Sequence, residues 1–436
     1  MNFTRICLSI DWPQAYLGAK DMVNSDMSEN NQHSDVIILG AGMIGLTQAL
    51  TLAAHGLTVA IIDRADPADL INPGKDERVS AINSASWNMF DAIGLADKLK
   101  PNGCAIEKIL VNDGLKPGTL DFVPGEDEGP MGVMVENALL RTLLFEAAQA
   151  EDAITLYMPN QVVSSDRGEH RVNVTLDDGQ ELIAPLLIAA DGRGSRMREE
   201  AGIIMAHWQY DHNAIVCKIA HEKPHGNTAY ELFFPAGPFA LLPMLDDENG
   251  KHRSAVVWTV SRKDGPALAN INKRAFVAEM TKRTGGFLGE IELLTDRPTY
   301  PLGFHHSSHL TADRMILIGD AGHGIHPIAG QGLNLGLRDV AALTECLVDA
   351  ARTGLDLADA QVLARYDRWR SLDNMTVSAA TDILTRVFGL PGETSSAIRR
   401  FGIGLVQRIP PLKAQFMAEA KGETGDLPKL LMGEMV

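Results

Sequence analysis

Short apolar runs and helical apolar spacing alternate in the first part of the chain. Asp35–Leu39 and Leu57–Ile62 are mostly apolar runs that predict buried strands, and Met43–His55 between them carries apolar residues at helical spacing. A strand, a helix and a second strand within about 30 residues form a βαβ unit, which builds parallel sheets. We therefore expect an α/β fold that begins with such a unit.

The same reading of apolar spacing predicts the later elements. Helices are expected at Ser80–Leu99, Val133–Ala150 and Ile271–Thr284, strands at Ile106–Val111, Thr119–Val123, Ile215–Ala220, Tyr230–Phe234, Phe239–Pro243 and Ser254–Val260, and a largely helical region from Leu333 to about Leu390. Between Ile154 and Ala190 strands alternate, and Asp177-Asp178-Gly179 predicts a hairpin whose second arm ends at Asp191-Gly192.

Glycines cluster between the first strand and the first helix. Gly40, Gly42 and Gly45 permit a tight turn, close approach of the backbone to a pyrophosphate and close contact between helix and strand. Asp63 ends the next strand, where a carboxylate can bind a ribose hydroxyl, and Arg64 follows it as a further candidate contact. The glycines lie between a predicted strand and a predicted helix, and an acid ends the next strand. A chance glycine turn would not require these neighbours, so the pattern predicts a Rossmann-like dinucleotide site.

A second glycine-rich helix start lies far downstream. A strand at Met315–Ile318 leads to Gly319 and Asp320, whose carboxylate can accept hydrogen bonds from a ribityl chain; a plain helix N-cap is the alternative. The helix start after it contains Gly330, Gln331, Gly332, Leu333 and Asn334. Its free N–H groups and dipole would stabilise negative charge on a reduced flavin. A cofactor held from both ends of the chain has to be long, and FAD has that length.

Three further candidate cofactor contacts each have a second interpretation. Asp191 ends a predicted strand and precedes Gly192, but the geometry of a strand followed by a helix cap also explains it. Arg78 can pair with a phosphate or shape the surroundings of the flavin, and a solvated surface arginine is the alternative. Arg141 lies on a predicted helix and is the third candidate.

Composition and charge narrow the functional classes. The 436 residues are 45% hydrophobic, enough for a large core, and a net charge of −17 without long runs of Lys or Arg argues against a nucleic-acid partner. The chain contains no run of about 18 apolar residues that would predict a membrane-spanning helix. The four cysteines form no CxxC pair, which fits a reducing cytoplasm.

Three histidines, His305, His306 and His309, invite a metal interpretation because two of them are four residues apart. They lack both a nearby set of carboxylates and a strong helical pattern, so we expect no metal site. The chain also has no Ser-His-Asp order and no HExxH motif, so the sequence gives no support to a hydrolase.

The chain resembles the class A flavoprotein monooxygenases, the group that contains p-hydroxybenzoate hydroxylase, and within it the ubiquinone-biosynthesis hydroxylases. The resemblance runs from about Asp35 to the C-terminus. It rests on Gly40, Gly42 and Gly45, Asp76-x-Arg78 with Ala81, Asp191-Gly192 with Ser195 and Arg198, Gly319-Asp320, and His326-Pro327-x-x-Gly330-Gln331-Gly332-x-Asn334-x-Gly336-x-x-Asp339. Gly322, where alanine is usual, and Asp63, where glutamate is frequent, are small departures.

The resemblance implies FAD that is reduced by NAD(P)H or another donor, reacts with dioxygen to a hydroperoxyflavin and hydroxylates the aromatic ring of a polyprenylated ubiquinone precursor. With one dinucleotide fingerprint in the chain, a nicotinamide donor would bind transiently. Three alternatives remain open: a hydroxylase of another aromatic, a flavin reductase of polyprenyl chains, and a non-catalytic flavin-bound assembly subunit.

These motifs and elements predict an interleaved domain organisation. We expect a disordered extension at 1–34, a Rossmann-like FAD-binding domain at 35–105, 130–200 and 305–350, a β-sheet substrate domain at 106–129 and 201–304, and a helical C-terminal region at 351–436. His326, Pro327, Phe234 and Phe239 are candidates to line the substrate cavity, although aromatic residues in strands more often belong to the core.

The C-terminal region also carries a candidate membrane contact. From Arg386 to Lys421 the chain has six basic and two acidic residues, and Ile398, Phe401, Leu405 and Ile409 fall at roughly helical spacing beside arginines. This predicts a cytoplasmic protein that contacts the inner membrane, or partner enzymes of ubiquinone biosynthesis, through this segment. A helix packed on its own core explains the pattern equally well.

Overall fold

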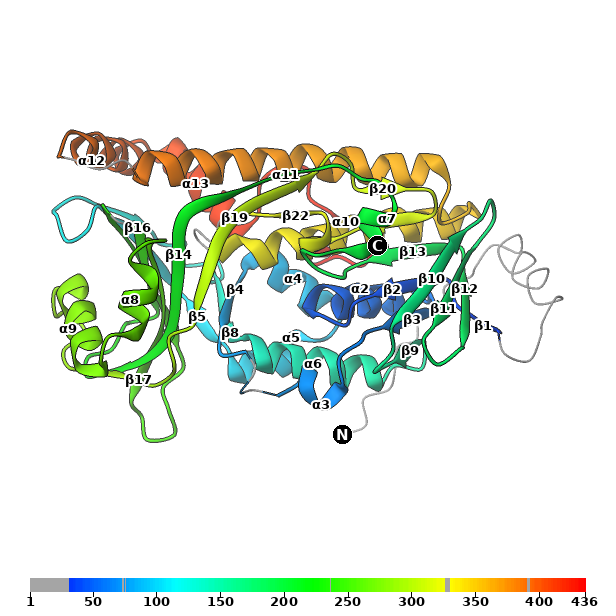
Figure 1. The fold of residues 1–436 in the computed structure, drawn as a ribbon. Coiled ribbons are helices and arrows are strands. Elements are labelled where there is room, and N and C mark those ends of the chain that lie inside the picture. The colour runs from blue at the N-terminus through cyan, green and yellow to red at the C-terminus, as the bar shows by residue number, and fades with distance from the viewer. Residues whose placement is uncertain (1–30, 73, 75, 236, 326–329, 390–392) are drawn as a thin grey trace, which may run out of the picture.

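The structure, a computed structural model, describes residues 31–72, 74, 76–235, 237–325, 330–389 and 393–436. Figure 1 shows two parts side by side: a layered α/β part, and a large sheet whose outer face is covered by two short helices. The long helix α11 (Ala360–Gly389) runs along the top of both parts.

A six-stranded sheet forms the centre of the α/β part. In spatial order its strands are β20 (Thr311–Ala312), β21 (Met315–Leu317), β13 (Leu186–Ala189), β2 (Val36–Leu39), β3 (Val59–Ile62) and β9 (Ile154–Tyr157), parallel except for β20. Helices α2 (Met43–Ala54), α6 (Asn137–Gln149) and α10 (Gln331–Thr353) pack together with it. Strands buried on both faces consist of continuous apolar residues, which is why these segments are apolar throughout.

A nine-stranded sheet forms the other part. Its main path is β22 (His323–Gly324), β19 (Thr299–Ser307), β14 (Met205–His221), β17 (His252–Ser261), β16 (Gly237–Met244), β15 (Thr228–Phe234), β6 (Lys108–Asn112) and β7 (Thr119–Phe122), and β18 (Ile291–Leu293) pairs with β14. Its outer face, defined here as the one packed against α8 (Gly265–Asn270) and α9 (Lys273–Thr284), carries a core that includes Phe239, Trp258 and Phe276. The inner face is the opposite one.

Two smaller sheets and the remaining helices complete the molecule. The sheets contain β1 (Asn31–His33), β12 (Glu181–Ala184), β11 (Val172–Leu176) and β10 (Val162–Arg167) in one case, and β4 (Val79–Asn83), β8 (Gly132–Glu136) and β5 (Cys104–Ile106) in the other. The remaining α-helices are α3 (Pro67–Leu70), α4 (Ser84–Ala92), α5 (Ala96–Leu99), α7 (Arg196–Glu200), α12 (Glu393–Arg408) and α13 (Pro410–Lys421), and the 3₁₀ helices are η2 (Lys100–Asn102), η3 (Gly319–Ala321) and η5 (Lys429–Met432).

Two predicted helices begin with strands instead. Residues 80–83 belong to β4 and residues 133–136 belong to β8, and these two strands pair in antiparallel fashion. Helix α4 begins only after Asn83, whose side chain accepts a hydrogen bond from Ser86 N. Apolar spacing cannot separate a short strand from the first turn of the helix that follows it, and the tertiary pairing decides the outcome.

Two further predictions need correction, and one is confirmed. Asn31–His33 were expected to be disordered but form β1, because their backbone pairs with β12 at a sheet edge. The Asp177–Gly179 hairpin forms, but its second arm ends at Ala184, where Pro185 interrupts it, and the chain continues into the six-stranded sheet as β13. The prediction of a largely helical region from Leu333 to about Leu390 is confirmed, since α10 and α11 cover most of it, with Gly354 in the left-handed conformation after the end of α10.

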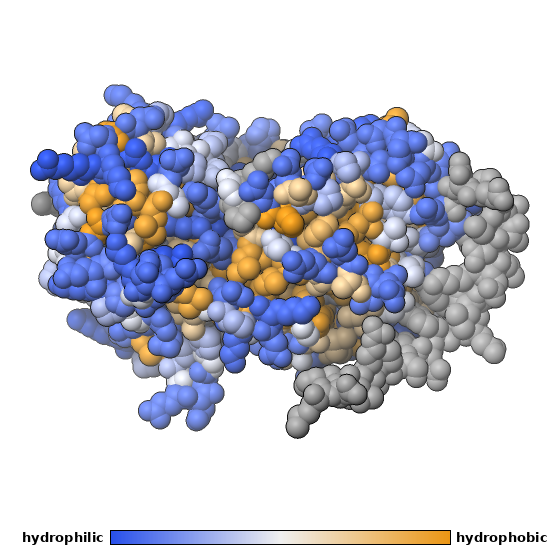
Figure 2. Space-filling view, turned by 90° about the horizontal axis from the view of Figure 1, so that it is seen from below, coloured by the Kyte–Doolittle hydropathy of each residue, from blue (hydrophilic) through white to orange (hydrophobic). Residues whose placement is uncertain are grey.

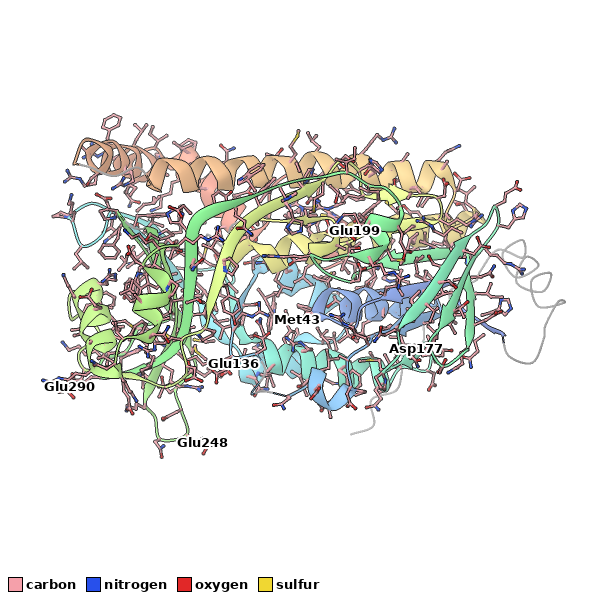
Figure 3. The ribbon with its side chains drawn as sticks, in the orientation of Figure 1. Met43, Glu136, Asp177, Glu199, Glu248 and Glu290 are labelled. Carbon is pink, nitrogen blue, oxygen red and sulfur yellow. The ribbon has the colours of Figure 1, made fainter. Side chains whose placement is uncertain are left out.

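Charged residues mark the extremities and the junction of the two parts. Figure 3 shows Asp177 at the far end of the α/β part, and Glu248 and Glu290 at the far end of the other part. Glu136 lies where the parts meet, and its carboxylate accepts a hydrogen bond from Lys218 Nζ of β14 at 2.5 Å. Seen from below, most of the surface is polar, and apolar residues gather in the region of α3 and α6 (Figure 2).

Candidate functional site

Four sequence motifs from distant parts of the chain lie along one edge of the six-stranded sheet. Asp320 follows β21, Asp191 follows β13, Gly40 follows β2 and Asp63 follows β3, and these four parallel strands are neighbours in that order. Ligands of open α/β sheets bind at the carboxyl ends of the strands. The predicted residues thus form a single row at the edge where such a ligand binds.

The three glycines of the first motif have different surroundings. Gly40 has φ +108, and a Cβ there would lie 2.4 Å from Ala190 O. A Cβ at Gly45 would lie 1.9 Å from Gly40 O, so this glycine allows α2 to approach the strand. A Cβ at Gly42 would meet nothing within 4 Å, although Gly42 is the N-cap of α2. The first turn of α2 therefore faces open space, as a phosphate site requires.

Asp63 fixes this glycine loop. Its carboxylate accepts hydrogen bonds from Ala41 N at 2.7 Å and from Ala65 N at 2.8 Å. Arg64, the next residue, is exposed. The acid at the end of β3 thus lies directly beside the glycine turn, in the position expected of a ribose contact.

Asp320 lies at the opposite end of the row and points outward. Its side chain is about half exposed and pairs with Arg193 Nε at 3.1 Å. The backbone of the turn is held from behind, because His305 Nε2 lies 2.9 Å from Asp320 O and Arg198 Nη1 donates to Ala321 O at 2.8 Å. The carboxylate therefore remains accessible on a turn whose backbone is fixed.

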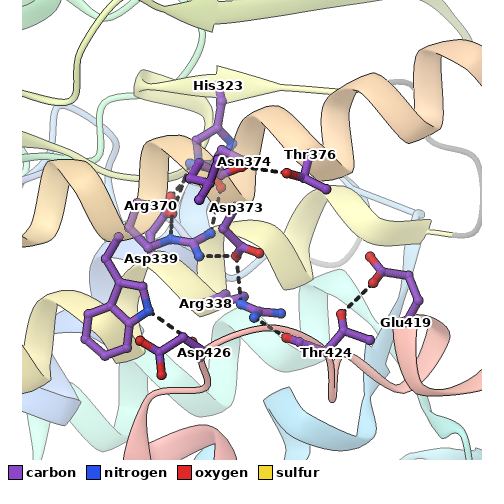
Figure 4. Close-up of polar contacts among 12 residues, drawn as sticks. His323, Arg338, Asp339, Arg370, Asp373, Asn374, Thr376, Glu419, Thr424 and Asp426 are labelled. Carbon is purple, nitrogen blue, oxygen red and sulfur yellow. Dashed lines mark hydrogen bonds and ion pairs between the residues drawn. The ribbon is translucent and has the colours of Figure 1, made fainter. Parts of the chain in front are cut away.

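A buried ion cluster also holds the backbone of this turn, and Figure 4 shows its members His323, Asp339 and Arg370. Asp339 of α10 is fully buried, and its Oδ2 accepts hydrogen bonds from Gly319 N at 2.9 Å and lies 2.5 Å from His323 Nε2. Its Oδ1 accepts from Arg370 Nε of α11 at 2.7 Å. Burial alone would raise the pKa of Asp339, but the charges and hydrogen bonds of His323 and Arg370 outweigh it and hold the pKa at about 2.

The sequence motif includes Asp339, but its partner on α11 was not predicted. Arg370 is buried, and its Nη2 donates to Asn374 Oδ1 at 2.6 Å. Tyr366, Arg370 and Asn374 are spaced four residues apart and share the buried face of α11. Polar residues at the spacing of a buried helical face were the signal that could have revealed them.

The start of α10 is bonded to β4. Gly330 is the N-cap with φ +65, Gln331 and Leu333 are half-buried, and a Cβ on Gly332 would meet open space. The Asn334 side chain is turned to the protein, since its Oδ1 accepts from Asn83 N at 3.0 Å and its Nδ2 donates to Ala81 O at 2.8 Å. Asn334 therefore positions the helix start. His326 and Pro327 lie outside the described residues.

Arg78 and Arg141 share one carboxylate, that of Asp76. Arg78 Nε lies 2.7 Å from Oδ1 and Arg141 Nη2 lies 2.6 Å from Oδ2. Burial would raise the pKa of Asp76, but these hydrogen bonds and charges hold it at about 2. The guanidinium of Arg78 also lies 5.5 Å from the centre of the Tyr300 ring of β19, so it links the two parts of the molecule.

The remaining candidates divide between the site and the core. Asp191 Oδ1 is buried and lacks a hydrogen-bond partner among the described residues, as expected of a group that awaits a ligand. Phe239, which was expected to line the cavity, is instead fully buried in the core of the outer face. Phe234 is half-buried against that core, and its part in the cavity stays a prediction. Within the described ranges, no group of three or more potential ligands is placed to hold a metal ion.

These features fit FAD better than a short ligand. An open helix start at Gly42 lies near one end of the row, an accessible carboxylate at Asp320 lies near the other, and an orphaned buried oxygen of Asp191 lies between them. Each is a position where a ligand would supply the missing contact.

Comparison with known proteins identifies the family. The model of the family described as "FAD binding domain" matches residues 33–380. The chain belongs to this family. Among its relatives, the ubiquinone hydroxylase UbiL of Rhodospirillum rubrum is 42% identical to it over 92% of both chains. The 3-demethoxyubiquinol 3-hydroxylase of Escherichia coli is 32% identical, over 90% of this chain and 99% of that one.

A solved structure agrees on the fold of this FAD-binding-domain protein. The p-nitrophenol 4-monooxygenase PnpA of Pseudomonas putida matches with a TM-score of 0.74 over 91% of this chain and 100% of that chain, at 17% identity. Identity at this level shows the fold alone.

Proposed function

We propose that the protein is an FAD-dependent monooxygenase that hydroxylates the aromatic ring of a polyprenylated ubiquinone precursor. The observation that carries the proposal is the 42% identity, along 92% of both chains, to a ubiquinone hydroxylase, together with a site whose open positions suit FAD. Bound FAD would supply the oxygen chemistry. The protein's own task is then to bind, to orient the ring and to exclude water.

The cofactor contacts follow the row of strand ends. The N–H groups at Gly42 would receive the pyrophosphate, Asp63 a ribose hydroxyl and Asp320 the ribityl chain. The open start of α10 at Gly330–Gly332 would lie beside the flavin, where its dipole favours negative charge.

The proposal places five other predicted residues beside these cofactor contacts. Asp191 would use its orphaned oxygen, and Arg78 and Arg141 would remain tied to Asp76 at the border of the site. Arg64 is exposed beside the first motif, and Asn334 positions the helix start through β4. NAD(P)H or another reductant would deliver electrons from outside.

Substrate conversion by the purified holoenzyme tests this function. We expect the reduced holoenzyme, given dioxygen and a short-chain prenylated phenol, to release a product heavier by one oxygen atom, measured by mass spectrometry with labelled dioxygen. An Asp320→Ala variant should lose FAD and the product, whereas Asp313→Ala, a nearby carboxylate outside the row, should retain both.

The outcomes separate the alternatives. Reduction of the prenyl chain without oxygen insertion would indicate a reductase, and oxidation of a different ring would indicate another aromatic substrate. Flavin binding with oxygen consumption that no compound couples to a product would indicate an assembly subunit. Each of these results would contradict the proposal.

We also infer that α12 is the contact surface for a membrane. Phe401 and Leu405 of α12 and Ile409, which directly follows this helix, are four residues apart and all exposed, with Phe401 74% exposed. Arg400 and Arg408 are exposed beside this apolar stripe. In the described ranges, no helix has both the length and the apolar composition needed to cross a bilayer, so this contact would be peripheral.

The charge of the segment contributes less than the sequence suggested. Arg399 pairs with Asp113 of the chain after β6, Lys413 with Asp121, and Lys421 with Glu128. These pairs attach α12 and α13 to the nine-stranded sheet. The apolar stripe therefore carries the proposed contact, and two arginines assist it.

Vesicle binding tests this surface. Replacement of Phe401, Leu405 and Ile409 by Ser should reduce co-sedimentation with anionic phospholipid vesicles at least about tenfold, because each buried apolar side chain contributes roughly 1.5–3 kcal/mol. A double control, Val163→Ser with Ile204→Ser, removes exposed apolar residues elsewhere and should bind normally. Equal binding by the triple variant would refute the contact.

A further inference from the structure

Glu231 of β15 lies on the inner face of the nine-stranded sheet. It is opposite Ala240 of β16 and Val111 of β6. Its neighbour Leu232 belongs to the core of the outer face, whereas Ala229, two residues earlier, belongs to a separate cluster. Because successive side chains of a strand point to opposite faces, the Glu231 carboxyl points inward with Ala229.

The surroundings of this carboxyl are apolar. The inner cluster includes Ile109, Val111 and Leu242 of the sheet, and Ile403 and Val406 of α12. Burial raises the pKa of Glu231 to about 7, and no charged group contributes to the change. In the ranges that the structure describes, no hydrogen bond or ion pair joins the side chain of Glu231 to another residue.

The charged residues on neighbouring elements are engaged elsewhere. Strand β16 carries none. Asp121 forms an ion pair with Lys413, and the nearby charge of Lys108 of β6 also helps to lower the pKa of Asp121. Asp113 is paired with Arg399. The Glu231 side chain thus has no partner among the described residues, and the inner cluster forms an apolar wall around it.

The side chain is nevertheless only half-buried. The inner face is covered by α12 and by the small sheet of β4, β8 and β5, whose side chains belong to the same inner cluster. A side chain of this face that keeps accessible surface therefore borders the space between these layers. An apolar environment is unfavourable for a carboxyl that has no hydrogen-bond partner. A ligand that enters this space with a hydrogen-bond donor would provide the missing partner.

We propose that Glu231 binds the ring hydroxyl of the substrate and thereby selects rings that carry a free hydroxyl. The inference rests on the proposed function, since it takes the substrate to be a prenylated phenol. The apolar wall would hold the ring and the beginning of its prenyl chain, and the carboxyl would accept the hydrogen bond that fixes the orientation of the ring. A site built around such a bond rejects analogues that lack the donor, because its polar group would stay unpaired.

Binding and turnover of two probes test the role of Glu231. The probes are a geranylated phenol and its methyl ether, with binding followed by flavin fluorescence and turnover by product formation. The wild-type holoenzyme should prefer the phenol. Glu231→Leu should weaken phenol binding and raise its KM about 10- to 100-fold, while the two probes become nearly equal. Glu231→Gln keeps an oxygen acceptor and should retain most of the preference.

Two controls separate this role from structural damage and from the proposed function. Glu292→Leu makes the same change at an exposed position of the same sheet and should leave KM and preference unaltered. If the wild type binds the phenol but forms no hydroxylated product, the proposed function fails while the binding comparison still stands. A Glu231→Leu enzyme with wild-type KM and undiminished preference would overturn the inference.

Discussion

Two glycines of one motif illustrate how residues of the same type perform different tasks. Gly45 is needed by the fold, since any side chain there would collide with the carbonyl of Gly40. Gly42 has φ −71, which every residue can adopt, and its position borders open space. The fold itself gives no reason for glycine at position 42, and the proposed phosphate site would supply one.

Alanine substitutions should separate these two tasks. Gly42→Ala should leave the stability of the apoprotein within about 1 kcal/mol of wild type and weaken FAD binding at least about tenfold, because the methyl group occupies the space of the phosphate. Gly45→Ala should destabilise the apoprotein by about 3 kcal/mol or more. Chemical denaturation and FAD titration measure the two effects. A Gly42→Ala variant with normal FAD affinity would argue against the phosphate site.

Sequence reasoning reached the residues whose role depends on backbone context. Gly40, Asp63 and Asp320 follow strands, and local patterns locate strand ends, so their common edge could be expected. Phe239 was misjudged because a period of two places a residue on a face without saying which face is inward. Glu231 was missed for the same reason: its meaning comes from the apolar residues of other strands around it.

At the level of elements, the turn after β21 depends on helices that are distant in sequence. Asp339 of α10 connects this turn to β22 and, through Arg370, to α11. A buried carboxylate of this kind is costly unless all its partners are present. The cluster therefore makes the position of Asp320 dependent on the packing of α10 against α11.

Removal of the buried charge of Asp339 should lower the free energy of unfolding much more than removal of an exposed charge on the same helix. We expect Asp339→Asn to lower the free energy of unfolding by about 3–5 kcal/mol and to weaken FAD binding. Asp349→Asn, which loses an exposed pair with Arg365, should cost at most about 1 kcal/mol. Urea denaturation at pH 7 compares the two; similar stabilities would show that the cluster contributes little.

The acid dependence of this contribution has a definite sign. The pKa of Asp339 in the folded protein, about 2, is below its ordinary value of 3.8, so ionisation stabilises the fold above pH 3.8 and this contribution is lost as the pH falls toward 2. The wild type should therefore lose stability in this window more steeply than Asp339→Asn. Thermal unfolding between pH 4 and 2 measures the difference.

Elements were predictable where length and periodicity agreed. Helix α2 and the strands around it follow the expected pattern closely, because a buried parallel sheet demands apolar runs. Strands β4 and β8 were not predicted, since their pairing joins residues about 50 positions apart and leaves no local mark. Pro185 was a local signal that could have placed the end of β12.

On the scale of the whole molecule, the C-terminal segment belongs to the core of the α/β part. Leu430 and Leu431 of η5 are buried and pack in the same cluster as the six-stranded sheet, and Val436 N donates to His55 Nε2 at 3.1 Å. Deletion from Arg386 onward would therefore remove core residues along with the α12 stripe. Point substitutions on α12 are the cleaner test of membrane contact.

A substitution in this segment should act on the stability of the entire α/β part. Leu431→Ala is expected to lower the free energy of unfolding by about 2–5 kcal/mol, because it leaves a cavity in a shared core. Met435→Ala, at an exposed neighbour, should change it by at most about 0.5 kcal/mol. Calorimetry of both variants measures the effect; a neutral Leu431→Ala would show that the segment is attached only loosely.

The two long strands β14 and β19 extend from one part of the molecule to the other (Figure 1). Their pairing is regular up to Gln209 and again from Asn213, with an irregularity between these two residues, and β17 joins β14 only from His212 onward. Hydrogen-bonded strands resist sliding past each other, but a bulge allows a local change of twist. The two strands thus form a stiff connection with one flexible point. Any movement of the nine-stranded sheet relative to the six-stranded sheet would therefore be a rotation about Tyr210–His212.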